Sequence, residues 1–331
     1  MCTAVTYRTK NHYFGRNLDL EYPYRETVVI TPRNYPFHFR RATSLPRHYA
    51  MIGMATVAEG YPLYYEATNE KGLSMAGLNF PQNAEYKPEA VGKDNITPFE
   101  FIPWVLGQCE TVAEAEMLLS RINLVNVPFS EQLPLSPLHW IISDRDRSVV
   151  VESVKEGLKV YDDPVGVLTN NPPFDFHMYN LRNYLNISNI QAENRFSSKI
   201  DLTPYSNGMG AMGIPGDWSS ASRFVRASFV KLNAISGDSE EESVCQFFHI
   251  LSSVAMPRGC VRMRADEYEI TLYSCCCNTD KGIYYYTTYE NSQITAVDMH
   301  RENLDSDRIV SYPLTTEQRI HWQNERQGEN T

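Results

Sequence analysis

The feature that most constrains this chain is the cysteine at its second position, directly after the initiator methionine. Cys2 has a small side chain of the kind that permits removal of Met1, and it would then carry both a thiol and a free α-amino group. Thiols titrate near pH ~8.5 and α-amino groups near ~7.7–8.0, so around neutral pH the amine can accept the thiol proton. N-terminal nucleophiles are activated in this way. Taken alone, however, Cys2 is more simply the residue that follows a start codon, so its context has to decide.

The residues after Cys2 predict a β-hairpin. Residues 3–9 alternate in polarity and are rich in β-branched side chains, residues 10–12 indicate a turn, and residues 13–19 form the returning strand. Such a hairpin brings Arg16 and Asp19 back beside Cys2. A nearby arginine favours the thiolate, and Asp19 could hold the amine or Arg16 by a charge-assisted hydrogen bond.

Composition narrows the class of protein. The chain has 331 residues, of which 42% are hydrophobic and 21% charged, as in ordinary soluble globular proteins. The formal charge of -10 and the absence of a Lys/Arg run give a nucleic-acid partner little support. No apolar run could span a bilayer and no export signal precedes the hairpin, which predicts a cytoplasmic protein without a membrane partner. Seven cysteines in such a chain predict free thiols rather than disulfides.

The order of the expected elements predicts the fold class. No repeat or linker divides the sequence, so we expect one domain over residues 1–331, with a core at 2–325 and a frayed C-terminus. After the hairpin, strands are expected at 27–31, 49–57, 61–67, 73–79, 138–143, 149–155, 158–161, 165–169, 268–277 and 282–289. Helices are expected at 97–106, 111–122, 220–235 and 241–254. Alternating groups of strands and helices indicate an α+β protein with two stacked, mostly antiparallel sheets covered by helices.

Known nucleotide-binding, metal-binding and hydrolase motifs are either absent from the chain or lack the structural context that they require. Residues 208–213 match the dinucleotide fingerprint by letter, but no clear strand precedes them and Pro215 follows where a helix should begin, so we interpret them as a glycine-rich loop. Cys275, Cys276 and Cys277 are adjacent, whereas zinc sites use spaced pairs; buried thiols in a strand are the better interpretation. The chain lacks G-x-S-x-G and H-E-x-x-H. Neither a metal nor a cofactor is therefore expected.

Three further stretches are unusual for structural loops. Asn79 and Asn170 each end an expected strand, where an amide could donate to a developing oxyanion. Arg223 lies in the first part of an expected helix, where a cation is poorly placed with respect to the helix dipole. Each residue taken singly is more often a turn or cap residue, but together with Cys2 they suggest an acyl-transfer site.

Ordered motifs along nearly the whole chain resemble the choloylglycine hydrolase family, and within it the bile salt hydrolases of lactobacilli. The resemblance rests on the sequences at residues 1–3, 14–19, 69–73, 76–80, 168–170, 216–224 and 281–286. It implies an N-terminal nucleophile hydrolase with a four-layer αββα sandwich, often assembled as a homotetramer, that uses no metal or cofactor. It also implies that Cys2 attacks the amide joining a bile acid to glycine or taurine, with its freed amine as base.

The resemblance implies roles for individual residues. Arg16 and Asp19 would flank Cys2, Asn79 and Asn170 would line the oxyanion hole, and Arg223 would complete the polar cluster. The steroid would require a broad apolar pocket with few polar anchors. The stretches that form it in the family correspond here to residues that could equally belong to the core: Leu20, Tyr24, Tyr65, Phe129, Leu133 and Leu135.

Two alternatives to bile salt hydrolysis stay open from the sequence. Family members include penicillin V acylases, whose position equivalent to Asn79 tends to be tyrosine, so the chain could also act on penicillin V or another N-acyl amide. A protein of a different class, which binds bile salts or similar amphiphiles without cleaving them, could use the same pocket. Retention of Met1 would favour this binder, because Cys2 would then have no free amine.

Overall fold

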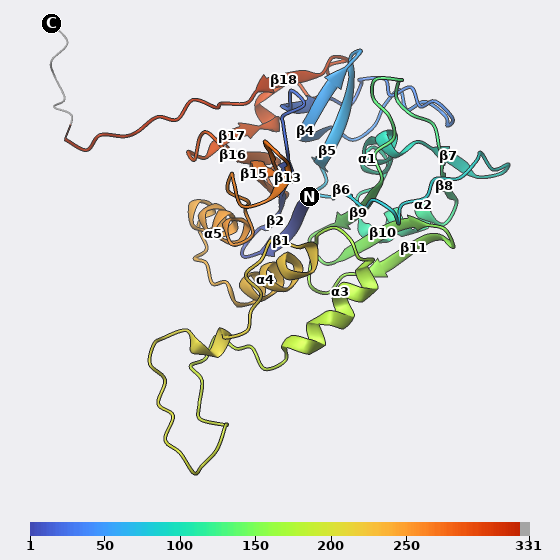
Figure 1. Cartoon of the computed structure of the whole chain (residues 1–331). Helices are drawn as coiled ribbons and strands as arrows, with labels where there is room; N and C mark the ends of the chain where they lie inside the picture. Colours follow the sequence, from blue (N-terminus) through green and yellow to red (C-terminus); the bar gives the residue numbers. More distant parts are fainter. Residues whose placement is uncertain (325–331) are drawn as a thin grey trace, which may run out of the picture.

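The computed structural model describes residues 1–324, and the predicted frayed end from residue 325 onward lies outside this range. Two antiparallel sheets stack on each other between layers of helices (Figure 1). The six-stranded sheet has the order β12-β1-β2-β15-β16-β17. Its strands are β1 (Cys2–Arg8), β2 (His12–Leu20), β12 (Val167–Leu168), β15 (Ile270–Asn278), β16 (Ile283–Thr288) and β17 (Thr295–Asp298).

The second sheet has eight strands in the order β11-β10-β9-β6-β5-β4-β3-β18. They are β3 (Thr27–Thr31), β4 (Met51–Ala58), β5 (Tyr61–Asn69), β6 (Ser74–Asn79), β9 (Leu138–Ser143), β10 (Ser148–Val154), β11 (Gly157–Asp162) and β18 (Val310–Pro313). Two small pairs complete the strands: the parallel pair β7 (Asp94–Ile96) and β8 (Ile122–Leu124), and the antiparallel pair β13 (Arg262–Arg264) and β14 (Glu267–Tyr268).

The helices cover the two outer faces. They are α1 (Phe101–Leu106), α2 (Val112–Leu119), α3 (Phe174–Asn180), α4 (Ser220–Asn233) and α5 (Glu240–Ser252). Short 3-10 turns occur at η1 (Pro98–Glu100), η2 (Leu181–Tyr184), η3 (Met209–Ala211) and η4 (Met299–Arg301). In Figure 1, α4 and α5 lie against the sheet that contains β1, and α1 and α2 lie beside the other sheet.

Side-chain alternation in the eight-stranded sheet explains the layers. Ile52 and Ile141 point into the core between the sheets, whereas their neighbours Met51, Trp140 and Ile142 point to the outer face, where they pack with α1 and α2. Successive residues of a strand project to opposite faces, so a strand that is apolar on both sides needs a layer on each side. The same cluster of apolar contacts continues through the six-stranded sheet to residues of α4 and α5 on its outer face. The expected four-layer αββα sandwich is therefore confirmed.

Most expected elements are confirmed, with shifted ends. The first hairpin pairs Cys2 with Leu18 and Ala4 with Arg16, as predicted. The helix expected at 97–106 consists of the turn η1 and the helix α1, and Pro103 has no N–H with which to bond the carbonyl of Phe99. The sequence prediction missed α3, whose aromatic residues resemble a strand, and the three-residue pair β7 and β8.

The cysteine predictions are also confirmed. Cys275, Cys276 and Cys277 are buried in β15, and all seven cysteines of the chain are free. The glycine-rich segment 208–213 forms the turn η3, flanked by Gly208 and Gly213 in the left-handed region. The element before η3 is the turn η2, so the strand that precedes a dinucleotide-binding loop does not occur at this position.

A long arm protrudes from the body between η2 and α4 (Figure 1). The arm contains no strand between η2 and α4, and η3, within residues 204–215, is its one regular turn. Proline at both ends of that stretch and five residues of glycine or methionine within 208–213 leave few β-formers to build a ladder. The base of the arm is closed by a hydrogen bond from Ser188 N to Gly210 O (2.9 Å).

Within residues 1–324, no helix combines the length and the apolar composition that crossing a membrane requires.

Candidate active site

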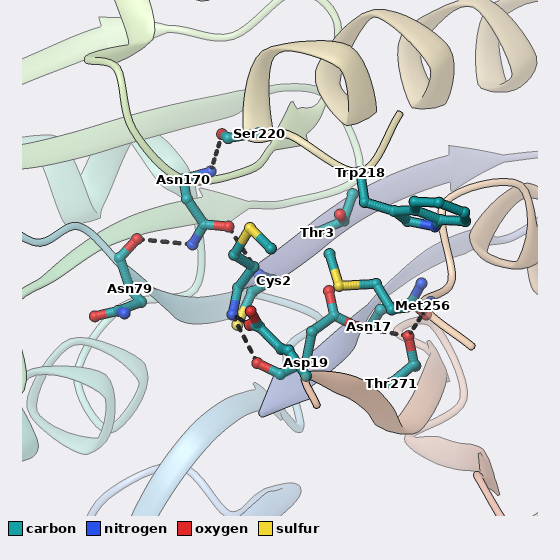
Figure 2. A network of polar contacts seen from close by, with 12 residues as sticks. Cys2, Thr3, Asn17, Asp19, Asn79, Asn170, Trp218, Ser220, Met256 and Thr271 are labelled. Atoms are coloured by element: carbon teal, nitrogen blue, oxygen red, sulfur yellow. Dashed lines mark hydrogen bonds and ion pairs between the residues drawn. The ribbon is translucent and has the colours of Figure 1, made fainter. Parts of the chain in front are cut away.

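Cys2 is the first residue of β1, a strand with neighbours on both sides, and its side chain is 3% exposed. The structure contains Met1, so the nitrogen of Cys2 is a peptide N–H that occupies the position of the α-amino group formed on removal of Met1. This N–H donates to Oδ1 of Asn170 at 2.8 Å (Figure 2). The hairpin register therefore delivers the nucleophile to a polar cluster at the end of the sheet.

The amine of Met1 is bound by two groups next to this cluster. Its amine donates to the carbonyl oxygen of Asp19 at 2.7 Å and forms an ion pair with the buried carboxylate of Glu269. Burial lowers the pKa of this amine, against the opposing effect of nearby negative groups such as Asp19. While Met1 is present, it fills the space immediately beyond the nitrogen of Cys2.

Asp19 is fully buried on β2. Its Oδ1 accepts a hydrogen bond from Thr271 Oγ1 at 2.6 Å, and Thr271 in turn accepts from the backbone N–H of Met256 (Figure 2). Oδ2 of Asp19 has no hydrogen-bond partner, and burial raises the pKa of this carboxyl group. We had expected Asp19 to hold either the amine of Cys2 or Arg16. With Met1 in place, its carboxylate bonds neither Arg16 nor the amine of Met1, and Oδ2 has no partner.

Arg16 is also fully buried. Its Nη1 donates to the carbonyl oxygens of Gly77 (2.6 Å) and Tyr65 (3.1 Å) and lies 3.7 Å from Oε2 of Glu66. Burial works against its charge, but Cys2, Tyr273 and Glu66 favour the cation, and the net effect is a raised pKa. A permanent positive charge therefore lies close to the nucleophile.

Arg223 joins several parts of the site. From the first turns of α4, its Nη1 donates to Cys2 O (2.5 Å) and Thr3 Oγ1 (2.6 Å), and its Nη2 donates to Asn170 Oδ1 (2.8 Å). Nε donates to Trp218 O at 2.9 Å. Burial lowers the pKa of this guanidinium against the opposing charge of Asp19, but arginine keeps its proton at physiological pH. The arginine thus fixes both the backbone of Cys2 and the side chain of Asn170.

Asn170 lies in the loop after β12 and is held on every side. Its Nδ2 donates to Asn79 O at 2.7 Å, its backbone N–H donates to Ser220 Oγ at 2.8 Å, and its carbonyl accepts from His177 Nε2 at 2.8 Å. Asn79 ends β6 and is half-buried. The structure therefore brings the two predicted oxyanion residues together at Cys2. Oδ1 of Asn170 faces the Cys2 nitrogen, so this residue also positions the base.

Sequence reasoning missed several contributors. Thr271 bonds Asp19 and Glu269 pairs with Met1, but neither side chain belongs to a motif. Thr3 stood in the motif at residues 1–3 without a role, and its hydroxyl accepts from Arg223. Thr271 could have been found only from the pairing of β15 with β2, which sets Thr271 opposite Asp19. Ser220 stood in the stretch that contains Arg223, and its role as an acceptor for Asn170 follows from its place at the start of α4.

The predicted substrate residues fall into two groups. Leu20 and Tyr65 are half-buried against the inner core, and Thr56 Oγ1 bonds both the hydroxyl of Tyr65 and the carbonyl of Tyr24 at 2.9 Å. Because Tyr65 O also binds Arg16, this group lies at the site. The second group is a loop in which Phe129 packs on Phe99 and Tyr61 under Arg40, followed by the half-buried Leu133 and Leu135. Among residues 1–324, no ring contact or hydrogen bond joins Phe129 to the residues around Cys2. The role of Phe129 in substrate binding therefore stays a prediction.

Fold and site together define a class of protein. Two antiparallel sheets lie between helical layers, and a thiol stands at the first position of an inner strand, with two buried arginines and an asparagine around it. This is the arrangement of an N-terminal nucleophile hydrolase in which a cysteine attacks and its own amine serves as base.

Comparison with known proteins agrees with this class. The sequence profile of the linear amide C–N hydrolases, choloylglycine hydrolase family, matches residues 2–312. The chain is 57% identical over 317 residues to the bile salt hydrolase/transferase of Lactiplantibacillus plantarum, covering 96% of this chain and 98% of that protein. A crystal structure of a mutant conjugated bile acid hydrolase from Clostridium perfringens superimposes with a TM-score of 0.90 at 40% identity, covering 98% of this chain and 100% of the other.

A more distant structure shares the fold alone. The penicillin V acylase from Agrobacterium tumefaciens is 18% identical, with a TM-score of 0.75 over 95% of this chain and 92% of that one. On the profile match and the full-length relatives, the chain belongs to the choloylglycine hydrolase family and is a linear amide C–N hydrolase.

Proposed function

We propose that this chain hydrolyses the amide bond of glycine- and taurine-conjugated bile salts. The observation that carries the proposal is the cluster in which Cys2, at the head of β1, meets Asn170 and Arg223 in a member of the choloylglycine hydrolase family. The names of the relatives from L. plantarum and C. perfringens point to the same substrates.

Removal of Met1 starts the chemistry. The freed amine of Cys2 takes the proton of the thiol, and the thiolate attacks the amide carbonyl carbon, forming a C–S bond while the π electrons move to the oxygen. Collapse of this intermediate breaks the C–N bond, and the α-ammonium group returns its proton to the leaving nitrogen. Water, deprotonated by the same amine, then attacks the thioester carbon and releases the bile acid and the thiolate.

The surrounding residues serve these steps by position and charge. Asn170 Oδ1 accepts a hydrogen bond from the nitrogen of Cys2. This bond orients the nitrogen so that its lone pair, or its transferred proton, is directed toward the sulfur of Cys2. The unpartnered Oδ2 of Asp19 is available to stabilise the α-ammonium group when it forms. Arg16 and Arg223 are buried cations that favour the thiolate and the developing oxyanion. The side chain of Asn79, at the end of β6, supplies an amide donor for that oxyanion.

In this proposal, Leu20, Tyr24 and Tyr65 line the part of the substrate pocket nearest Arg16, and the loop that carries Phe129, Leu133 and Leu135 lines another part. A steroid face is rigid and apolar, and aromatic and leucine side chains with few polar groups suit it. The linked hydroxyls of Tyr65 and Thr56 supply polar anchors at its edge.

The experiment that tests the function measures three products from one preparation of Met1-processed protein. We expect release of glycine from glycocholate and taurine from taurocholate, and little phenoxyacetate from penicillin V. Cys2→Ala should reduce turnover at least about a thousandfold while it leaves the thermal unfolding curve in place. Cys245→Ala, at an exposed free thiol, is the matched control and should keep full activity.

The other outcomes would each change the assignment. Cleavage of penicillin V alone would keep Cys2 as nucleophile and replace the bile salt by another acyl group. Saturable binding of bile salts without any product would show an amphiphile-binding protein. Turnover in Cys2→Ala at the wild-type level would refute Cys2 as the nucleophile.

We also propose a homotetramer that works in the cytoplasm, with residues 1–331 as one domain. The support for assembly is the arm, which exposes a series of apolar side chains to solvent: Leu185, Ile190, Phe196, Ile200, Leu202, Tyr205 and Met212. Exposed apolar patches of this extent are typical of interaction surfaces. The support for the cytoplasm is the set of free cysteines.

A further inference from the structure

Behind Arg16 lies a buried carboxylate, Glu66, that the mechanism above does not use. Glu66 is on β5 of the eight-stranded sheet, and its side chain reaches into the interface between the two sheets. Oε1 accepts a hydrogen bond from the hydroxyl of Tyr284 at 2.6 Å, and Oε2 accepts from the hydroxyl of Tyr273 at 2.8 Å. The thiol of Cys275 lies 3.5 Å from Oε1. All three donors belong to the opposite, six-stranded sheet.

The contacts of Glu66 stabilise its ionised form. Each of its oxygens lies at hydrogen-bond distance from a tyrosine hydroxyl, and the guanidinium of Arg16 lies beside Oε2. Burial raises the pKa of Glu66 overall, and the charge of Arg16 and the two tyrosine hydroxyls act against this rise. A buried charge with a cation at 3.7 Å and its lone pairs satisfied is stable in the interior, whereas either partner alone is costly.

Glu66 is coupled to the nucleophile through Arg16. Tyr65 and Glu66 are adjacent on β5, so this strand holds the guanidinium twice, by the carbonyl of Tyr65 and by the carboxylate of Glu66. The charged or titratable groups that act on Arg16 come from β1, β2, β5 and β15: Cys2, Asp19, Glu66, Tyr273 and Cys275. A negative charge at Glu66 therefore offsets part of the positive potential that Arg16 exerts at Cys2.

We propose that Glu66 is a positioning residue for the reaction, which fixes the guanidinium of Arg16 between the sheets and, by offsetting its charge, sets the pH range in which the Cys2 thiolate forms. The kinetic part of this inference rests on the proposed bile salt hydrolysis. The electrostatic part concerns Cys2 and Arg16 alone and can be measured without any substrate.

The test compares Glu66→Gln with wild type by the rate of iodoacetamide alkylation of Cys2 from pH 5 to 10. Mass spectrometry of the N-terminal peptide separates Cys2 from the exposed Cys245 and Cys260. Without the carboxylate, Arg16 is no longer offset, so we expect the alkylation profile to move to lower pH by about one unit. Glu100→Gln is the matched control. Glu100 is a buried carboxylate of η1 that accepts from the backbone N–H of Arg40, and its substitution should leave the profile unchanged.

A profile of folded Glu66→Gln that superimposes on wild type, or that moves to higher pH, would overturn the proposal. Absence of bile salt turnover in the wild-type protein would contradict the proposed function, but the alkylation profile of Cys2 could still be measured. Failure of the proposed function is therefore distinguishable from failure of the role of Glu66. A merely structural Glu66 would lower the folded fraction without moving the profile.

Tyr284→Phe keeps the proposal testable if Glu66→Gln does not fold. The variant removes one hydroxyl from the carboxylate and leaves all charges, so we expect kcat for glycocholate to fall at least about threefold with KM unchanged. Tyr286→Phe is its control, since Tyr286 is equally buried on β16 but donates to Thr315. Equal kinetics of the two variants would overturn the positioning role.

Discussion

Arg223 connects residues that are far apart in the sequence, because its donors reach the carbonyl of Cys2, the hydroxyl of Thr3 and the amide oxygen of Asn170. A guanidinium group can serve these acceptors together because its N–H groups diverge in one plane, which the single ammonium group of lysine cannot reproduce. The contribution of this residue to the site is therefore geometric as well as electrostatic.

We predict that Arg223→Lys lowers kcat at least about tenfold although the positive charge is kept, because Cys2 and Asn170 lose fixed donors. Steady-state kinetics with glycocholate measure the effect. Arg226→Lys is the matched control: Arg226 is one turn further along α4 and binds the carbonyls of Ser253 and Pro215, away from Cys2. Wild-type kcat in Arg223→Lys would contradict the geometric role.

At the scale of single residues, the sequence revealed the groups that carry chemistry and missed those that hold them. Cys2, Asn170 and Arg223 could be named because their residue types are unusual at a chain start, a strand end and a first helical turn. Thr271 and Glu66 could not, because a threonine or glutamate in a strand has many ordinary roles. Their partners are set by the pairing of strands and the stacking of sheets, which no local pattern encodes.

Helix α3 supports the site through one histidine. His177 Nε2 donates to the carbonyl of Asn170, its ring stacks on Phe224 at 4.7 Å between centroids, and Nδ1 has no partner. Burial lowers the pKa of His177 to about 4. The neutral ring thus suits the fold, and a second proton would have to be placed on a nitrogen without an acceptor.

This arrangement predicts acid lability. An unfolded histidine titrates near pH ~6.5, so between there and about pH 4 the unfolded state binds more protons than the folded state. The stability that neutral His177 confers is therefore complete above that range and is lost as the pH falls through it, by up to about 3 kcal/mol. Chemical denaturation at several pH values should show a shallower pH dependence for His177→Gln.

The control for this prediction is His38→Gln, since His38 is exposed. It should keep the wild-type slope of unfolding free energy against pH. Burial also lowers the pKa of His12 to about 4, so part of the slope remains in His177→Gln. Identical slopes for wild type and His177→Gln would contradict a neutral, structurally engaged His177.

At the scale of elements, long and regular patterns were readable and short ones were not. The strands expected at 49–57 and 138–143 are β4 and β9, and Thr111, the first residue of an expected helix, caps α2 with its hydroxyl accepting from Glu114 N at 3.2 Å. Helix α3 follows Pro172 and Pro173, and its aromatic residues favour strands by propensity. Tertiary packing of Phe174 against Phe224 of α4 and Tyr161 of β11 overrides that propensity.

Among residues 1–324, the arm between η2 and α4 and the C-terminal segment after β18 extend away from the compact body (Figure 1). Phe196 and Tyr205 are 83% and 82% exposed in the arm. We predict that Phe196→Ser with Tyr205→Ser reduces the tetramer to smaller species, because the apolar area that drives association is lost. Light scattering after size exclusion measures the mass.

Val91→Ser is the control for the arm, since Val91 is a fully exposed apolar residue of another loop. It should leave the mass of the assembly unchanged. A wild-type protein that is monomeric at micromolar concentration would contradict the proposed assembly, and a tetramer in the double variant would assign its interface to another surface.

The hold on Met1 has a consequence in time. In the folded chain the amine of Met1 is bound by the carbonyl of Asp19 and the carboxylate of Glu269, while the Met1 side chain is still 30% exposed. Glu269 follows Met1 by 268 residues, so at roughly 5–20 residues per second the ribosome needs roughly 13–54 s to supply it. The amine of Met1 is therefore free of this ion pair during synthesis and engaged in it afterwards. We expect cleavage of Met1 to be faster on the nascent chain than on the folded protein.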